Sequence, residues 1–294
     1  MTFRQFRDED YEAVCRFLIA MNQQDRSHIN WNWARFEWMF RHPEFDDSLR
    51  SAIGLWWEVE RVVGAAIYDM YFGEAFCAVL PEYRALYPAV LDYAYRALKD
   101  ENGLGIAICD GNTAEIQAAE TAGFVRSEQT ETILARSLDA LPSRSLPEGV
   151  SIVELDPAKE NDDFQWLLWQ GFDHGSDRTA FEAQAETVAP FRPHFDPSLS
   201  LAAIDLSGEK LAYCCLWVRC DTDYAYVEPV CTIPSQRGRG LASALLTEAM
   251  RRAAALGAKT AYVISDQVFY KKLGFEEVQH FTFYWKPLIL CCSF

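Results

Sequence analysis

The sequence lacks several features that define large classes of protein. None of its apolar runs approaches the roughly 20 residues that a membrane-spanning helix needs, so we expect no membrane association. The opening residues, MTFRQFRDED, contain no apolar core of the kind that a secretory signal peptide carries, which predicts a cytoplasmic location. Nine cysteines occur without a paired C-x-x-C motif, which argues against a zinc site or a disulfide framework and predicts no bound metal.

Positive charge is also scarce. The chain has 27 Lys and Arg against 43 Asp and Glu, a formal net charge of −16, and both halves are acidic. A surface that neutralises nucleic-acid phosphates needs clustered Lys and Arg, so we expect no nucleic-acid partner. An acidic surface instead favours cationic partners.

Apolar residues, by contrast, are plentiful. They make up 50% of the 294 residues, and 14% are aromatic, which is ample for packed cores. The length favours two domains. The stretch LDALPSRSLPEG, from Leu138 to Gly149, has the composition of a linker. We therefore expect domains over residues 1–138 and 150–294, joined by a linker over 139–149.

Two local patterns recur at nearly the same spacing in the two halves. Val79–Arg84 and Thr232–Arg237 each leave an apolar run, turn at Pro and reach Arg three residues later. Ala122–Phe124 and Leu273–Phe275 share Gly-Phe after a helical pattern. The agreement favours duplication of one domain plan over coincidence.

The second half alternates between strand-like and helix-like patterns. We expect strands over 151–155, 199–205, 210–218, 224–232, 260–265 and 281–286, and helices over 162–172, 179–188, 241–256 and 268–273. Mixed elements with an antiparallel meander predict an α+β fold, with a sheet flanked by helices.

The segment QRGRGLA, from Gln236 to Ala242, follows an apolar strand and opens a helix. Glycines there let backbone N–H groups approach a ligand, and the helix dipole favours an anion such as a pyrophosphate. Arg237 and Arg239 add positive charge. The alternative is a glycine-rich turn with surface arginines.

Two motifs carry a family resemblance. Arg237-x-x-Gly240-x-Ala242, entered from VCTIP at 230–234, resembles the acyl-CoA pyrophosphate loop of the GNAT acetyltransferase superfamily. FYKKLGF at 269–275 is similar to that superfamily's later motif, in which a Tyr precedes Leu-Gly-Phe. The resemblance covers about 150–286. The first half follows it only in outline, so the chain looks like two tandem GNAT-like domains.

The resemblance implies acetyl-CoA as cosubstrate and assigns its contacts. They would be at Val230, Cys231, Thr232, Arg237, Gly238, Arg239, Gly240, Leu241 and Ala242. The backbone N–H groups of 230–232 would also serve the oxyanion. The resemblance further implies that strand 224–232 splays from strand 260–265. Pro229 suits such a splay, although it could equally mark an edge strand.

Glu228 is the candidate general base, because alternation places it on the same strand face as Val230. The alternative is a carboxylate on a solvated face. Tyr270 is the candidate acid for the CoA sulfur, and the alternative is a buried structural Tyr. The approach to Tyr270 lacks the Asn that often begins this helix in the family, and we expect Asp266 to cap the helix.

The first half lacks the matching groups. Tyr87 and Pro88 stand where Gly240 and Leu241 do, and Ala75 and Ala119 stand where Glu228 and Tyr270 do. We therefore expect a non-catalytic, structural half that cannot cradle a pyrophosphate. His28, His42 and His280 show no ligand spacing and receive no role.

Aromatic residues gather in the segment that borders the acceptor pocket in this family. They are Trp166, Trp169, Phe172, His174, Phe181, Phe191, His194 and Phe195. Core packing is the better explanation for most of them. Asp173, Asp177 and Asp196 could attract an ammonium group. In some tandem members the C-terminal carboxylate enters the site, and the tail 287–294 could do so here.

These features lead to one function and three alternatives. The first is an N-acyltransferase that moves acetyl from acetyl-CoA to a primary amine of a small, cationic molecule. The others are an acetyltransferase of proteins or peptides, a non-catalytic CoA-binding or regulatory module, and a structural protein whose glycine loop is incidental.

Overall fold

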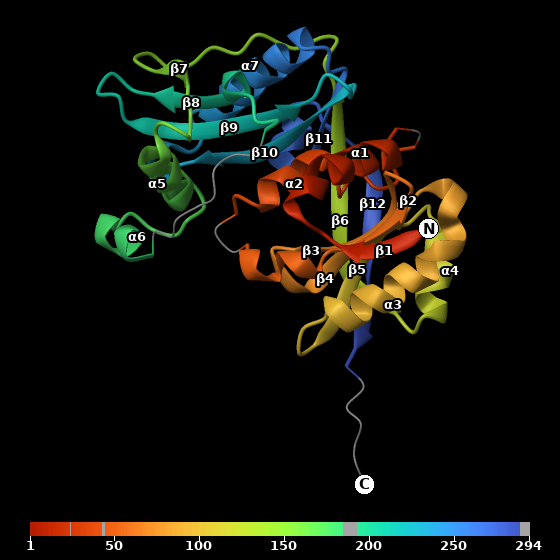
Figure 1. The fold of residues 1–294 in the computed structure, drawn as a ribbon. Coiled ribbons are helices and arrows are strands. Elements are labelled where there is room, and N and C mark those ends of the chain that lie inside the picture. The colour runs from red at the N-terminus through yellow and green to blue at the C-terminus, as the bar shows by residue number, and fades with distance from the viewer. Residues whose placement is uncertain (24, 43–44, 185–192, 289–294) are drawn as a thin grey trace. The chain divides into compact units, whose positions relative to one another are not determined.

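The computed structural model describes residues 1–23, 25–42, 45–184 and 193–288 (Figure 1). By their internal contacts these residues form two compact units. The first unit contains residues 1–133, 264–266 and those from Glu277 onward, and the second contains 134–263 and 267–276. The units depart from a division at 139–149, because the last strand of the chain packs within the first unit.

The first unit is built on a mixed sheet. Its strand order is β1-β2-β3-β4-β5-β12, with β6 beside β12. The pairs β1–β2, β2–β3, β3–β4 and β5–β12 are antiparallel, and β4–β5 is parallel. The strands are β1 (Thr2–Gln5), β2 (Gly54–Glu58), β3 (Arg61–Asp69), β4 (Tyr71–Val79), β5 (Gly103–Cys109), β6 (Val125–Ser137) and β12 (Glu276–Pro287).

Helices cover both faces of this sheet. Figure 1 shows α1 and α2 on one side of the strands and α3 on the other, which buries β3 almost throughout. Asn32 caps α2 by accepting from the backbone N–H groups of Ala34 and Arg35. The helices are α1 (Tyr11–Met21), α2 (Trp33–Met39), α3 (Tyr87–Ala97) and α4 (Thr113–Thr121), with 3₁₀ turns η1 (Asp8–Asp10), η2 (Asp47–Ala52) and η3 (Pro81–Leu86).

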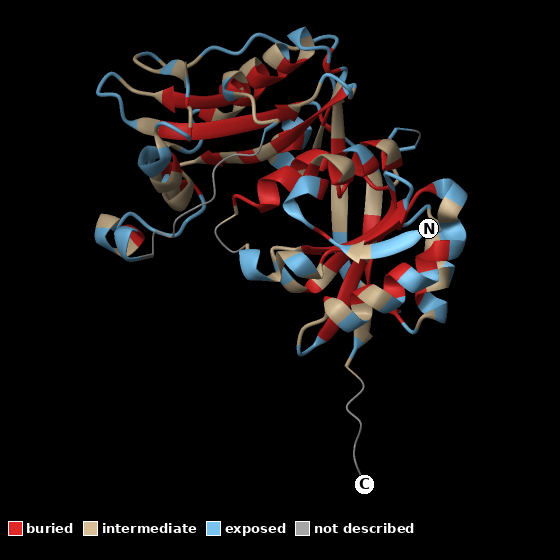
Figure 2. Ribbon diagram, in the orientation of Figure 1, coloured by how far each residue is buried: buried red, intermediate tan, exposed pale blue. Residues whose placement is uncertain are grey.

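The second unit repeats this plan with the strand order β11-β10-β9-β8-β7. Helices α5 and α7 both contact β9, and Figure 2 shows the resulting burial along β8 and β9. The strands are β7 (Ser151–Glu154), β8 (Ser200–Ile204), β9 (Lys210–Val218), β10 (Tyr224–Thr232) and β11 (Thr260–Ile264). The helices are α5 (Asn161–Gly171), α6 (Arg178–Gln184), α7 (Leu241–Ala255) and α8 (Val268–Lys272), with 3₁₀ turns η4 (Pro197–Leu199) and η5 (Pro234–Gln236).

The predicted α+β class is confirmed, and the two halves share one order of elements. The series β4–η3–α3–β5–α4 in the first half corresponds to β10–η5–α7–β11–α8 in the second. Each series contains a parallel strand pair, β4–β5 and β10–β11. This supports the duplication inferred from the two short motifs. Residues 139–149 form neither helix nor strand.

One strand boundary was predicted wrongly. The last strand begins at Glu276 rather than at residue 281. Its first three residues, Glu276, Glu277 and Val278, are all exposed and only one is apolar, so they lack the alternating apolar pattern on which the prediction relied. Part of the predicted helix over 179–188 and most of the tail 287–294 lie outside the described residues. Among the residues that are described, no helix has the length and apolar character needed to cross a bilayer.

Candidate active site

The glycine loop between η5 and α7 forms an open backbone surface. Gly238 and Gly240 adopt φ values of +77° and +82°, which favour glycine. A Cβ atom added at either position would meet no atom within 4 Å, so the space in front of the loop is free of described atoms. Gly240 is the N-cap residue of α7 and makes no side-chain capping bond. The first N–H groups of this 15-residue helix therefore keep their capacity to bind an anion.

Arg237 is held more firmly than the sequence suggested. Its Nε donates to the Thr232 carbonyl oxygen at 3.1 Å. One of its terminal nitrogens donates to the Gly171 carbonyl oxygen and to the Asp173 carboxylate, each at 2.9 Å. These bonds fasten the loop to the end of α5. Arg239 is exposed and donates to the side chain of Gln236 within the loop.

The parallel strands β10 and β11 separate after three pairings. The ladder runs from Tyr224–Thr260 to Tyr226–Tyr262, while β10 continues to Thr232. Its register against β9 shifts between Val227 and Val230. On the β11 side, the backbone from 230 to 232 has no strand partner within the described ranges. The splay that the resemblance implied is thus present, and an amide-bearing chain could bond there.

Glu228 lies in this irregular part of β10. Its Oε2 accepts a hydrogen bond of 2.6 Å from the Tyr226 hydroxyl. Its backbone carbonyl oxygen accepts one of 2.8 Å from Nε1 of Trp217. The residue is half-buried. A carboxylate oriented in this way at the mouth of the splay can accept a proton.

Tyr270 is 8% exposed and lies on the short helix α8. Its ring packs between Phe269 and Phe275, with centroid distances of 4.9 and 5.6 Å. Burial raises the pKa of the Tyr270 phenol, and the nearby Cys214 and Glu228 raise it further. The phenol is therefore protonated at neutral pH and close enough to Glu228 to sense its charge.

The expected cap of α8 is wrong. Gln267, not Asp266, occupies the N-cap position, and no side chain accepts a capping bond there. The helix begins at Val268, so Asp266 lies one position before the N-cap.

The aromatic residues predicted near the acceptor divide into two groups. Phe181 packs against Trp166 at 5.3 Å and Trp169 at 5.8 Å, and His174 lies 5.0 Å from Trp169. Phe195 instead packs against Trp217 at 5.7 Å. Phe191 lies outside the described residues. The first group is a cluster of α5 and α6, so part of the predicted set does gather.

The three aspartates near this segment have local roles. Asp173 pairs with Arg237 at 2.9 Å. Asp177 accepts from the backbone N–H of Thr179 at 2.9 Å, and Asp196 accepts from that of Ser198 at 2.9 Å. Asp173 thus holds Arg237, whereas Asp177 and Asp196 stabilise the starts of α6 and η4.

In the first half, the corresponding loop has a different form. Turn η3 continues directly into α3, where Tyr87 is 3% exposed and Pro88 follows it. Ala75 and Ala119 are buried and offer no polar group. Sequence reasoning nevertheless missed a pair in this half between the buried His28 and the half-buried Glu115. Its members are 87 residues apart, and no local pattern signals such a contact.

Comparison with known proteins points to one superfamily. Residues 197–277 match the model of the acetyltransferase (GNAT) domain. The mycothiol acetyltransferase of Pseudarthrobacter chlorophenolicus is 26% identical over 214 residues, which are 67% of this chain and 65% of that protein. The match therefore spans less than two thirds of the relative.

Solved structures match over almost the whole chain. A tandem GNAT protein from the clavulanic acid biosynthesis pathway matches with a TM-score of 0.61 at 14% identity. The match covers 97% of this chain and 98% of that protein. A GCN5-related N-acetyltransferase from Sphaerobacter thermophilus has a TM-score of 0.59 at 17% identity, with coverage of 97% and 95%. At these identities the likeness shows the fold. The second half thus contains a GNAT-superfamily domain, and the whole chain has a tandem GNAT-like fold.

Proposed function

We propose that the second half transfers an acetyl group from acetyl-CoA to a primary amine of a small molecule. The observation that carries this proposal is the loop from Arg237 to Gly240. It presents two left-handed glycines and an uncapped helix start beside the splay of β10 from β11. This combination suits a pyrophosphate followed by an amide-bearing chain.

The reaction forms an N–C bond and breaks a C–S bond. The amine nitrogen attacks the thioester carbonyl carbon, and the carbonyl oxygen gains negative charge. The C–S bond then breaks and releases CoA as a thiolate. The amine loses one proton overall and the thiolate gains one, so the products are an amide and free CoA thiol.

We assign these proton transfers to two residues. Glu228 accepts the amine proton, either directly or through water, since Tyr226 orients its carboxylate. Tyr270 donates to the thiolate, because its raised pKa keeps the phenol protonated. Backbone N–H groups of residues 230–232 supply the donors for the oxyanion.

Two observations support a small, cationic acceptor. The name of the mycothiol acetyltransferase relative refers to mycothiol and not to a protein. The net charge of −16 raises the local concentration of cations around the molecule. The three aspartates that serve local roles add to this field even though each already has a partner.

The test is release of CoA thiol from acetyl-CoA across a panel of small primary amines. Tyr270→Phe should lower kcat by about 10²- to 10⁴-fold, the usual contribution of one general acid, while acetyl-CoA affinity stays nearly unchanged. Tyr95→Phe is the matched control, because Tyr95 is a surface residue of α3 whose hydroxyl bonds to the Pro287 carbonyl oxygen.

Three results would contradict the proposal in different ways. Unchanged turnover in Tyr270→Phe would remove this residue from the mechanism. Transfer only to peptide amines would replace the small-molecule acceptor. Acetyl-CoA binding without transfer to small or peptide amines would indicate a non-catalytic CoA-binding module.

A further inference from the structure

The first unit contains a cavity of about 700 Å³ that none of the catalytic assignments uses. It lies at the end of β4 and β5, and η3, the start of α3, the start of α4 and the turn after α1 complete its wall. The pairing of β4 with β5 covers only residues 74–75 and 105–106, so these strands also separate toward the cavity. Its volume is in the range of pockets that hold organic molecules.

An ionisable pair, a buried histidine with a half-buried glutamate, forms part of the wall. Nε2 of His28 lies 3.1 Å from Oε1 of Glu115, and Nδ1 lies 2.9 Å from the Ser27 hydroxyl. His28 is 7% exposed. Groups of this kind are seldom buried unless they are paired. One oxygen of Glu115, Oε1, contacts His28, so the carboxylate can still accept a hydrogen bond from a ligand.

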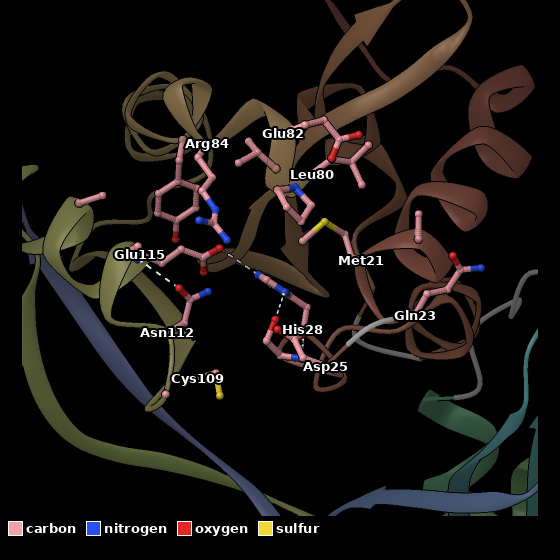
Figure 3. A pocket seen from close by; sticks show the side chains of 18 of the residues that line it. Met21, Gln23, Asp25, His28, Leu80, Glu82, Arg84, Cys109, Asn112 and Glu115 are labelled. Carbon is pink, nitrogen blue, oxygen red and sulfur yellow. Dashed lines mark hydrogen bonds and ion pairs between the residues drawn. The ribbon is translucent and has the colours of Figure 1, made fainter.

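The acidic and basic side chains that line the cavity are Asp25, Glu82 and Glu115, and Arg61, Arg84 and His28. Asp25 accepts from the backbone N–H of Ser27 at 2.9 Å. Arg61 pairs with Glu82 at 3.3 Å, and His28 pairs with Glu115. Arg84 forms no ion pair with any described residue. Figure 3 shows the Arg84 side chain extending into the pocket on the side of Glu115. Arg84 is exposed at the cavity, and its guanidinium offers donors to an oxyanion.

We propose that this cavity is a second ligand site, which binds a small organic oxyanion bearing a hydroxyl or amine group. Arg84 contacts the carboxylate or phosphate of the ligand, and Glu115, held by His28, accepts a hydrogen bond from the hydroxyl or amine. The site belongs to the half without the catalytic groups, so it does not depend on the proposed acetyl transfer.

The local backbone distinguishes this ligand from CoA. The glycine loop of the second half offers N–H groups, whereas η3 and α3 are continuous and carry Tyr87 and Pro88. Proline has no N–H, and the Tyr87 side chain occupies the wall of the cavity. Recognition here must therefore come from side chains.

Cys109 provides a local probe of occupancy. It is a free, half-buried thiol on the cavity wall, and the exposed Cys220 of the second unit is an internal reference. The full chain is alkylated with iodoacetamide in the presence of gluconate or glycerol 3-phosphate, and the rate at each cysteine is followed by peptide mass spectrometry. A ligand at ten times its Kd should slow Cys109 about 11-fold and leave Cys220 unchanged.

Variants test the assigned contact. Arg84→Gln should raise the ligand concentration needed for half-maximal protection of Cys109 by about 10- to 100-fold, because it removes a charged hydrogen-bond donor. Arg96→Gln should not, since Arg96 is exposed on α3, pairs with Asp92 and does not line the cavity. Gluconate protection would identify a carboxylate ligand and glycerol 3-phosphate protection a phosphate ligand.

Several results would overturn the proposal. The first is that neither anion protects Cys109 at millimolar concentration, and the second is that neutral glycerol protects it equally well. Protection that survives in Arg84→Gln would remove the oxyanion contact. Protection by acetyl-CoA alone would replace the small ligand with a second CoA site.

Discussion

At the scale of single residues, the His28–Glu115 pair couples the stability of the first unit to pH. Burial alone would lower the pKa of His28, but the charge and hydrogen bond of Glu115, together with Asp25, raise it overall. A pKa raised by folding contributes stability that is fully present below the unfolded value, near 6.5, and is lost as the pH rises through the folded value.

Glu115→Gln keeps the size of the side chain and removes its charge. We expect it to lower the free energy of unfolding by about 1–3 kcal/mol at mildly acidic pH, because a charged imidazolium then lacks its partner. The difference from the parent chain should shrink as the pH rises above the folded pKa of His28. Urea unfolding at a series of pH values measures this, and a difference that grows with pH would contradict the coupling.

The residues that could be predicted are those that act through local sequence. Gly240 and Tyr270 stand in short motifs, and the structure places both in the second unit with a physical role available to them. The bonds that hold Arg237 join it to Gly171 and Asp173, more than 60 positions away. No spacing in the chain encodes such a contact, and the same is true of His28 and Glu115.

At the scale of elements, a single substitution can test whether the loop before α7 binds acetyl-CoA. Gly240→Tyr copies the Tyr87 of the first half and should abolish the thermal shift that acetyl-CoA produces. In the parent chain, ligand at 100 times its Kd should add about 2.7 kcal/mol, or several degrees in Tm. The variant blocks the backbone approach and strains a position with φ of +82°.

Gly208→Tyr is the control for that strain. Gly208 has φ of +87° and also meets no atom within 4 Å of an added Cβ, but it lies in the turn between β8 and β9. Gly208→Tyr should lower the Tm of the free protein about as much as Gly240→Tyr does, but acetyl-CoA should still raise its Tm. A full shift in Gly240→Tyr would show that acetyl-CoA binds elsewhere.

Most elements of the second half could be predicted because their patterns are local. Strands β9 and β10 have the predicted bounds, since apolar residues and flanking turns define them. The start of β12 was missed because its exposed, mostly polar residues gain strand structure from pairing and not from burial. The sheet order depends on such pairings, so the sequence predicted the fold class better than the neighbours of each strand.

At the scale of the whole molecule, the last strand completes the first unit. Seven residues of β12, from Phe281 to Pro287, pair with β5 from Cys109 to Gly103. A fragment of residues 1–138 would leave that edge of β5 unpaired. We expect this fragment to aggregate or to unfold without cooperativity, and a synthetic peptide of residues 276–288 to restore a cooperative transition.

Thermal unfolding by circular dichroism, with and without the peptide, checks this expectation. A peptide with the same composition in scrambled order is the control. Cooperative unfolding of the fragment alone, at the Tm of the full chain, would show that β12 is dispensable for the first unit.

The same strand sets an order of events during synthesis. The ribosome makes β5 about 170 residues before β12, and translation at roughly 5–20 residues per second makes that interval on the order of ten seconds or more. Throughout it, the edge of β5 is available to other chains or to chaperones. The half of the protein that is made first therefore finishes folding only after β12 has emerged from the ribosome, which ties its quality control to the synthesis of a distant segment.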